Sequence, residues 1–344
     1  SHQQLGRATR SRGAKPGARA EFALPLMGDG ETLHYQSVVP SAGADGAAAA
    51  EGFFDLANAR CVRYTVAVGE REAREGRGGG EGDGETNEAS GSSRAGEVEL
   101  VVEQDQSLHD SCGGIVWESA YALEQYMRLN IGRICASPPV KRKRGLSRCK
   151  VLELGAGAGL LGLAVAARGA KATVLTDHPN AMPLLERNVR RNSALFEPVG
   201  KKRKKRGDAN ADAETTTTTT SKSKSKPKCM PLDWTNDAHV DAVAREGPFE
   251  IILATDVVFN ETLVTPLLAA IRACGGPRTI AYVCIQERCA AAFNAFRRLA
   301  SSALGTAREV PREELGFVDE ECVLFELKAT MDVFADARRE LSVE

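Results

Sequence analysis

The sequence lacks several features that would assign it at once to a common class of protein. No uncharged apolar run reaches the ~18 residues that a membrane-spanning helix needs, and the longest, residues 154–167, is largely glycine and alanine. No Cys-x-x-Cys pair occurs among the nine cysteines, so neither a disulfide framework nor a structural zinc site is supported. His109 and Cys112 have ligand-like spacing but lack a second pair, so we expect no metal. These absences exclude a membrane-spanning protein and indicate reduced thiols in a cytosolic or nuclear one.

A large net charge is also missing, because 45 basic residues nearly balance 46 acidic ones. The basic and acidic residues are nevertheless distributed unevenly along the chain. Residues 141–150 hold six basic residues and no acid, residues 199–228 hold ten basic and three acidic, and the remainder has 29 basic against 43 acidic residues. A basic folded surface for nucleic acid is therefore not indicated. The two tracts match nuclear-import clusters or nucleic-acid patches, but we favour solvated insertions and do not favour a nucleic-acid partner.

What is present suits one α/β domain with inserts better than the two domains that 344 residues suggest. We expect a disordered basic and alanine-rich arm over residues 1–50, a hairpin and helix over 51–130, the main domain over 131–330 and a tail over 331–344. Disordered insertions are expected at 69–96 and 199–228, where composition opposes core formation. The arm is Arg-rich and acid-poor before Glu21, as organelle transit peptides are, but a plain disordered tail is the interpretation we favour.

Strands and helices alternate through the main domain. Period-two patterns predict a hairpin at 61–68 and 97–103, and apolar spacing predicts a helix at 115–127. Further strands are expected at 151–154, 172–176, 229–232, 249–254, 279–285 and 321–327. The intervening helices are expected at 160–168, 181–192, 263–274 and 289–299. This order predicts an α/β fold, a mostly parallel Rossmann-like sheet with helices on both faces.

The sharpest motif is the segment ELGAGAG, residues 153–159, which follows a strand and opens a helix. Glycines there let a ligand approach the backbone, and the helix start offers free amide groups. Gly157, Gly159 and Gly162 also spell G-x-G-x-x-G, and Asp177 lies where a dinucleotide fold carries its ribose-binding acid. The motif alone therefore fits a dinucleotide or S-adenosylmethionine (SAM).

Three observations favour SAM. Glu153 precedes the first glycine by two residues, at the position of the acid in SAM-binding loops. Asp233 and Trp234 close the third strand of the domain and offer a carboxylate and a flat ring for an adenine. Asp256 to Phe259 (sequence DVVF) closes the fourth strand, where open α/β sheets place residues that contact a ligand.

The order of motifs resembles the seven-β-strand (class I, non-SET) SAM-dependent protein lysine methyltransferases, which include enzymes acting on valosin-containing protein and on heat-shock chaperones. The resemblance covers residues 97–328 apart from the insertion and implies a seven-stranded methyltransferase sheet preceded by a hairpin. Its motifs are, in chain order, GIVW at 114–117, LEQY at 123–126, ELGAG at 153–157, TD at 176–177, NVRRN at 188–192, LDW at 232–234 and DVVF at 256–259.

The resemblance implies a role for each matched position. Trp117 covers the methionine end of SAM, Asp177 accepts both ribose hydroxyls, and the backbone from Gly155 through Ala156 to Gly157 takes the carboxylate side. Trp234, with Asp233, borders the adenine. Thr255 contacts the cofactor just before Asp256, which faces the transfer site and orients the lysine amine.

One position departs from the family pattern, because Phe259 stands where the motif has tyrosine. Phenylalanine keeps an aromatic face for a cation but loses the hydroxyl. The expected reaction is in-line attack of a neutral lysine amine on the activated methyl group, with the protein supplying alignment and desolvation. The partner is then a protein, such as a chaperone or an ATPase, and the enzyme is expected to be a monomer in the cytoplasm or nucleus.

Two other functions stay open at this stage: methylation of RNA or another nucleophile, and a catalytically silent SAM-binding protein. Each site residue also has a plain structural interpretation. Trp117 and Trp234 fit core aromatics, Asp177 and Asp256 fit helix caps, Glu153 fits an exposed strand end, and Phe259 fits the core. His178 is taken as a bystander of Asp177.

Overall fold

The computed structural model describes residues 20–25, 32–37, 59–68, 96–111, 113–136, 145–197, 224–315, 322–330 and 333–334, with backbone alone for 20–25, 32–37 and 109–111. The expected insertion at 69–96 falls outside these residues except for Gly96. The expected insertion at 199–228 lies outside the described residues as far as residue 223. Most of the expected tail at 331–344 also lies outside them.

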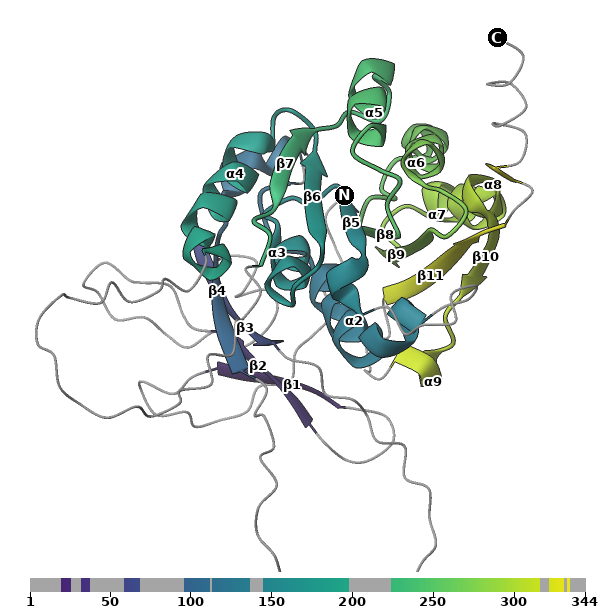
Figure 1. The fold of residues 1–344 in the computed structure, drawn as a ribbon. Coiled ribbons are helices and arrows are strands. Elements are labelled where there is room, and N and C mark those ends of the chain that lie inside the picture. Colours follow the sequence, from purple (N-terminus) through teal and green to yellow (C-terminus); the bar gives the residue numbers. More distant parts are fainter. Residues whose placement is uncertain are drawn as a thin grey trace, which may run out of the picture.

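A seven-stranded sheet in the order β10-β11-β9-β8-β5-β6-β7 forms the centre of the molecule (Figure 1). Neighbouring strands from β9 to β7 run parallel, whereas β11 is antiparallel to both β9 and β10. The bounds are β5 Lys150–Leu154, β6 Ala172–Asp177, β7 Lys228–Pro231, β8 Ile251–Thr255, β9 Ile280–Gln286, β10 Gly305–Glu309 and β11 Cys322–Ala329. The predicted Rossmann-like methyltransferase fold is confirmed.

Chain order reverses at β5, which pairs with β6 on one side and β8 on the other. At such a switch point the connections leave in opposite directions over the two faces of the sheet. A crevice therefore opens beyond the carboxyl end of β5, which is where open α/β sheets bind their ligands.

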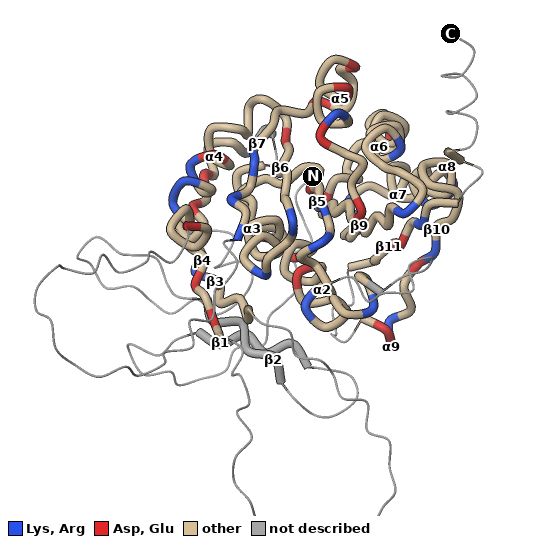
Figure 2. Tube along the Cα trace, viewed as in Figure 1, with Lys and Arg blue, Asp and Glu red and all other residues tan. Residues whose placement is uncertain are grey.

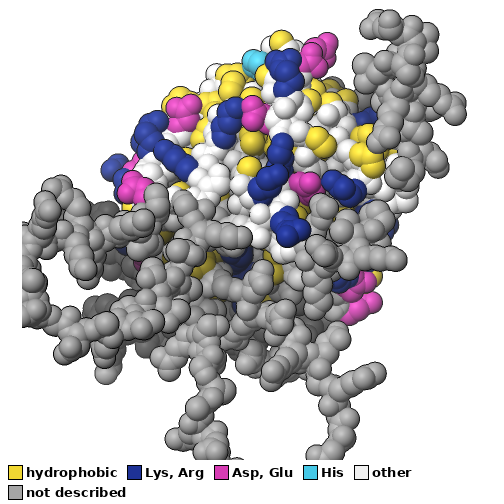
Figure 3. Space-filling model, in the orientation of Figure 1, with side chains coloured by type: hydrophobic (Ala, Val, Ile, Leu, Met, Phe, Trp, Pro, Cys, Tyr) yellow, Lys and Arg dark blue, Asp and Glu magenta, His cyan; other side chains and the backbone are white. Residues whose placement is uncertain are grey.

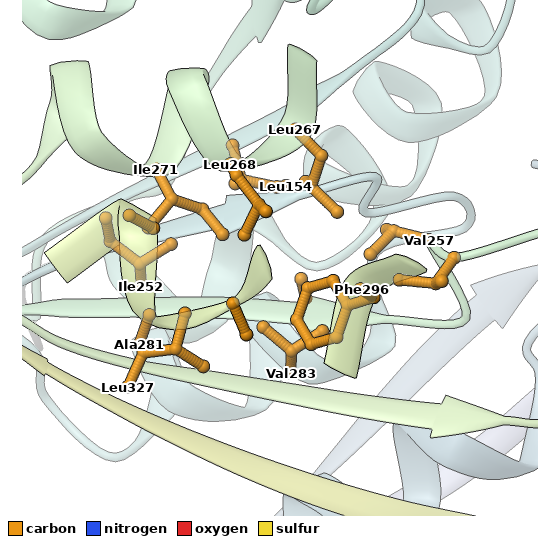
Figure 4. Close-up of a cluster of buried hydrophobic side chains, with 14 of the residues drawn as sticks. Leu154, Ile252, Val257, Leu267, Leu268, Ile271, Ala281, Val283, Phe296 and Leu327 are labelled. Carbon is orange, nitrogen blue, oxygen red and sulfur yellow. The ribbon is translucent and has the colours of Figure 1, made fainter. Parts of the chain in front are cut away.

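Helices cover both faces of the sheet because the central strands are apolar on both sides. Helices α2 (Glu118–Ala136), α3 (Leu160–Ala167) and α4 (Met182–Arg191) pack on one face. Helices α5 (Asp237–Ala244), α6 (Glu261–Cys274) and α7 (Ala290–Leu299) pack on the other. Figure 4 shows the second core, where Leu267 and Ile271 of α6 and Phe296 of α7 meet side chains from the sheet. The short helices are α8 Ser301–Leu304, α9 Arg312–Leu315, η1 Gln106–Ser111, η2 Leu146–Arg148 and η3 Ser193–Phe196.

An antiparallel hairpin, β3 (Cys61–Val68) and β4 (Gly96–Glu103), lies beside α3 and α4. Asn188 of α4 and Asn192, which follows α4, bind the free edge of β4. The main-chain N–H groups of Glu103 and Val101 donate to the two Asn side-chain oxygens, at 2.8 and 2.9 Å. The family motif NVRRN is thus explained by structure, since these amides satisfy an edge strand that would otherwise be open.

The second structural motif, LEQY, holds α2 in place. Glu124 is fully buried, pairs with the nearly buried Arg168 after α3, and accepts a hydrogen bond from Tyr64 of β3. A buried carboxylate needs such partners. The pair therefore fixes α2 against the helix that follows the glycine loop.

The structure corrects several sequence-based expectations. Helix 115–127 begins at Glu118 and runs on to Ala136, because residues 113–117 line the cavity described below instead of coiling. Helix α5, capped by the Asn236 side chain, and edge strand β10 (sequence GTARE) were not predicted, since neither has strong apolar spacing. The expected disordered arm contains a hairpin, β1 Ala20–Pro25 with β2 Thr32–Ser37. The other predicted elements agree to within two residues.

The described surface carries both charges. Both signs occur along the helices in Figure 2, and Lys and Arg predominate over Asp and Glu on the described part of the face shown in Figure 3. None of the described helices has the length and hydropathy of a membrane span. The described cysteines are free thiols, and no cluster of three potential metal ligands occurs among the described side chains.

Candidate active site

A cavity of 330 Å³ opens at the carboxyl ends of the central strands, within the size range of cofactor sites. It lies at the switch point beside β5. All eleven residues proposed from the sequence lie in its wall: Trp117, Glu153, Gly155, Ala156, Gly157, Asp177, Asp233, Trp234, Thr255, Asp256 and Phe259. They come from five separate stretches of chain, so the fold brings together what the sequence spaces over more than a hundred residues.

The loop between β5 and α3, in which every residue is glycine or alanine, forms one wall. Gly155 has φ of 64° and Gly157 has φ of 55°, the left-handed region that favours glycine. A Cβ atom on Gly155 would lie 2.6 Å from Val257 Cγ1 and 3.7 Å from Trp234 Cζ2. Val257 thus occupies the space that a side chain at position 155 would need, so the loop can only pass here with glycine.

Asp177, at the end of β6, faces the same loop. One carboxylate oxygen accepts the Gly157 N–H at 2.6 Å and the other accepts the His178 N–H at 2.7 Å. Burial raises the pKa of this carboxyl, and the two backbone hydrogen bonds oppose that shift. Each oxygen keeps another lone pair, so the group is held in place yet still able to accept hydrogen bonds. One bond comes from the glycine loop and the other from the adjacent His178, and neither comes from α4, so Asp177 is not a simple helix cap.

Glu153 is buried, 1% exposed, and is not the exposed strand end of its plain interpretation. Its Oε2 accepts the Gly162 N–H of α3 at 3.0 Å. Burial raises its pKa to about 8, the Gly162 hydrogen bond opposes the shift, and nearby Asp177 adds to it. The group is therefore mainly protonated at neutral pH, which spares the cavity a second buried negative charge.

Asp233 and Trp234 form the wall beyond β7. Asp233 Oδ1 accepts hydrogen bonds from the Thr235 hydroxyl at 2.7 Å and the Thr235 N–H at 2.9 Å, and these lower its pKa. Trp234 packs partly against the apolar core while its ring edge approaches the glycine loop. His178 also lines the cavity, with Nε2 4.0 Å from Asp233 Oδ2.

Asp256 follows β8 with φ of 52°, the only positive φ of a non-glycine residue in the described chain. Strain of this kind persists where the surroundings impose it. The carboxylate is held from two sides: Oδ1 accepts the Gln286 N–H at 2.9 Å, and Oδ2 lies 3.3 Å from Arg288 Nη2. The cap of α6 is Asn260, so the helix-cap interpretation of Asp256 is wrong.

Two aromatic side chains, Trp117 and Phe259, line the same cavity as this carboxylate. Phe259 is 41% exposed, so its core interpretation is wrong. The Trp117 ring lies under the guanidinium group of Arg288, whose carbon is 4.2 Å from the ring centroid. Sequence reasoning missed Arg288, Gln286 and Glu118. Their position after β9 was a usable signal for the first two, because β9 is the parallel neighbour of β8.

The sheet order, the glycine loop and the acids at the ends of β5, β6 and β8 define a Rossmann-like methyltransferase, whose cofactor is SAM. The chain belongs to the lysine methyltransferase family, whose sequence profile matches residues 95–205 and 208–302.

Two curated mouse (Mus musculus) proteins are similar to the chain. EEF1A lysine methyltransferase 3 is 29% identical over 202 residues, which is 58% of this chain and 68% of that protein. Protein N-lysine methyltransferase METTL21A is 26% identical over 154 residues, which is 45% of this chain and 51% of that protein. The chain thus spans about half the length of the second relative.

Solved structures are similar at a lower level. A TehB-like SAM-dependent methyltransferase from Corynebacterium glutamicum has a TM-score of 0.37 and 15% identity, covering 65% of this chain and 93% of that one. PKMT2 from Rickettsia typhi in complex with AdoHcy has a TM-score of 0.30 and 16% identity, covering 48% and 25%. Similarities this weak carry no argument about substrate.

Proposed function

We propose that this protein transfers a methyl group from SAM to a lysine side chain of a protein substrate. The observation that carries the proposal is the acceptor side of the cavity, where the carboxylate of Asp256 lines the same wall as the aromatic side chains of Trp117 and Phe259. A carboxylate beside aromatic faces suits a cationic amine and its methylated products. The curated relatives named as lysine methyltransferases support the same substrate class.

The residues on the cofactor side fit SAM. In the proposed arrangement the carboxylate of Asp177 accepts the two ribose hydroxyls through its remaining lone pairs. The backbone from Gly155 to Gly157 meets the methionine part, and Trp117 covers that end. Trp234 borders the adenine with Asp233, while Thr255 contacts the cofactor beside the acceptor site. Buried Glu153 supports the loop through Gly162.

On the acceptor side, bound SAM supplies a methyl group already activated by its sulfonium charge. The protein's task is then to align a neutral amine and to keep water away. Asp256 is the proposed acceptor for an N–H of that amine. Phe259 has no hydroxyl, so orientation of the amine rests on the carboxylate and on the aromatic faces.

The test is to incubate the purified protein with methyl-labelled SAM and a cell extract, and to divide the product between protease and nuclease digestion. We expect label in a discrete, nuclease-resistant protein band, which hydrolysis then assigns to methyl-lysine. The Asp177→Ala variant is the negative control.

Label lost to nuclease would instead support RNA methylation, and deletion of residues 199–228 would then test the basic insertion. SAM binding without any transfer would identify a silent binding protein and make Phe259→Tyr the next variant. A labelled chaperone or ATPase would identify the partner class.

A further inference from the structure

Arg288 contacts two residues on the acceptor side of the cavity in a way that methyl transfer does not explain. It lies in the loop between β9 and α7, outside every motif of the family pattern, and its side chain is 38% exposed. Its guanidinium carbon lies 4.2 Å from the Trp117 ring centroid, and its Nη2 lies 3.3 Å from Asp256 Oδ2. Arg288 thus contacts at once the two groups proposed to receive the lysine.

These contacts are those that an incoming lysine would make. An aromatic face and a carboxylate together recognise a cation, whether it is a guanidinium or an ammonium group. Arg288 and a target lysine therefore compete for one position, since Asp256 Oδ1 is already taken by the Gln286 N–H.

The burial of Asp256 gives the arrangement a physical reason. Its side chain is 5% exposed, and a carboxylate this deeply buried is costly without a partner. Before a substrate binds, Arg288 supplies that partner. Arg288 itself is well exposed, so its hold is weak enough to be released. A lysine that arrives as an ammonium ion restores the pairing when it replaces Arg288 and gives up a proton to solvent before methyl transfer, whereas an acceptor that never carries a charge leaves the carboxylate unpaired.

The surrounding contacts keep the position assembled. Arg288 Nη2 also donates to Gln286 Oε1, and Gln286 Nε2 donates to Glu118 Oε2 at 2.8 Å. Glu118 is the first residue of α2 and directly follows Trp117. The end of β9 and the start of α2 are therefore linked on either side of the guanidinium group.

We propose that Arg288 is an internal substitute for the target lysine, which holds the acceptor position between Trp117 and Asp256 until a cationic side chain displaces it. This inference rests on the proposed function and adds a determinant of acceptor specificity. Because an acceptor can bind only while the site is free of Arg288, its apparent affinity falls in proportion to the fraction of time that the site is free. The affinity for SAM is unchanged.

The first test needs no methyl transfer. The chain has two tryptophans, so protein labelled with ¹⁵N-tryptophan gives two indole N–H signals, which Trp234→Phe assigns. We expect Arg288→Ala to move the Trp117 signal and Arg298→Ala, an exposed arginine of α7, to leave it in place. Titrated n-butylammonium chloride, a mimic of the lysine side chain, then moves the Trp117 signal saturably in Arg288→Ala but not in the unmodified protein. Equal shifts in both proteins, or in neither, would overturn the proposal.

The second test measures kinetics with the substrate identified above. We expect Arg288→Gln to lower the KM for the acceptor by about tenfold, with the KM for SAM unchanged, and Arg288→Lys to restore the original acceptor KM. An unchanged or raised acceptor KM in Arg288→Gln would overturn the idea. If no acceptor is methylated at all, the proposed function fails, while the indole signals still decide whether a cation competes with Arg288.

Discussion

The two sides of the cavity differ in whether main-chain groups or side chains form them. The cofactor side, after β5 and β6, is a backbone surface in which glycines remove side chains and one aspartate is fixed by two main-chain N–H groups. The acceptor side, after β8 and β9, is a set of side chains in which Asp256, Gln286 and Arg288 hold one another. The cofactor side is determined by local sequence, whereas the acceptor side depends on contacts between distant segments.

The two sides also differ in the groups that contact their buried acids. The buried acids of the cofactor side, Glu153 and Asp177, have pKa values raised by burial, and within the described part of the chain their hydrogen bonds come from main-chain N–H groups. Asp256 is paired with a guanidinium group. Backbone and burial set the cofactor side, so it is expected to be rigid and sensitive to added atoms. Exchangeable ion pairs set the acceptor side, so it is expected to tolerate change and to respond to substrate.

The largest expected effect concerns Glu153, whose pKa rises from 4.5 in an unfolded chain to about 8 in the folded one. The folded state then binds a proton more tightly, so this group's contribution to stability is complete below pH 4.5 and is lost as pH rises towards 8. The loss is on the order of 4 kcal/mol. Urea unfolding of the unmodified protein and of Glu153→Gln at pH 5, 6.5 and 8 checks it. We expect the variant to gain relative stability with rising pH, and parallel pH profiles would contradict the shift.

The next effect concerns cofactor affinity. We expect Asp177→Ala to weaken SAM binding by roughly 100-fold, about 3 kcal/mol, because two charge-assisted hydrogen bonds are lost. Calorimetric titration with SAM measures the change. Asp177→Asn, which keeps an acceptor for the Gly157 N–H, is the control. Its SAM affinity should lie between those of the unmodified protein and of Asp177→Ala. Undiminished SAM affinity in Asp177→Ala would remove the assignment of the cofactor side.

A pair of glycines separates crowding from backbone strain. Gly155 and Gly169 both have positive φ, but a Cβ atom would lie 2.6 Å from Val257 at Gly155 and within 4 Å of nothing at Gly169. We expect Gly169→Ala to cost about 1 kcal/mol of stability, from strain alone, and Gly155→Ala about 2 kcal/mol or more, with weaker SAM binding. Thermal unfolding of both variants is the measurement. Equal losses would mean that Val257 moves aside freely.

Much of the fold was predictable because each central strand is an apolar run bounded by a turn or a helix. β3 was placed to the residue and β5 to within one, since their patterns are local. β10 was missed because an edge strand needs few apolar residues and GTARE has little of that signal. The start of α2 was misplaced because residues 113–117 follow the cavity wall, which is a tertiary constraint.

The candidate site shows the same division. Glycine spacing and strand-end acids predicted the positions on the cofactor side because a parallel sheet aligns the ends of its strands. The contact between Arg288 and Trp117 joins residues 171 positions apart in the chain, and no local pattern marks it. The left-handed backbone of Asp256 is equally invisible in the sequence, since the strain there is imposed by its surroundings.

The smallest expected effect tests whether the two sides are separable. Asparagine tolerates a left-handed backbone better than most residues, so Asp256→Asn keeps the turn and removes only the charge. We expect SAM affinity to change by less than about twofold, under ~0.5 kcal/mol, because the cofactor contacts proposed for Asp177 and the glycine loop do not involve this carboxylate. Methyl transfer falls in the same variant, because the amine loses its charged acceptor. Calorimetry with SAM, beside turnover on the labelled substrate, gives both numbers. A large loss of SAM affinity would show that the acceptor carboxylate also supports the cofactor, and the two sides would then be one unit.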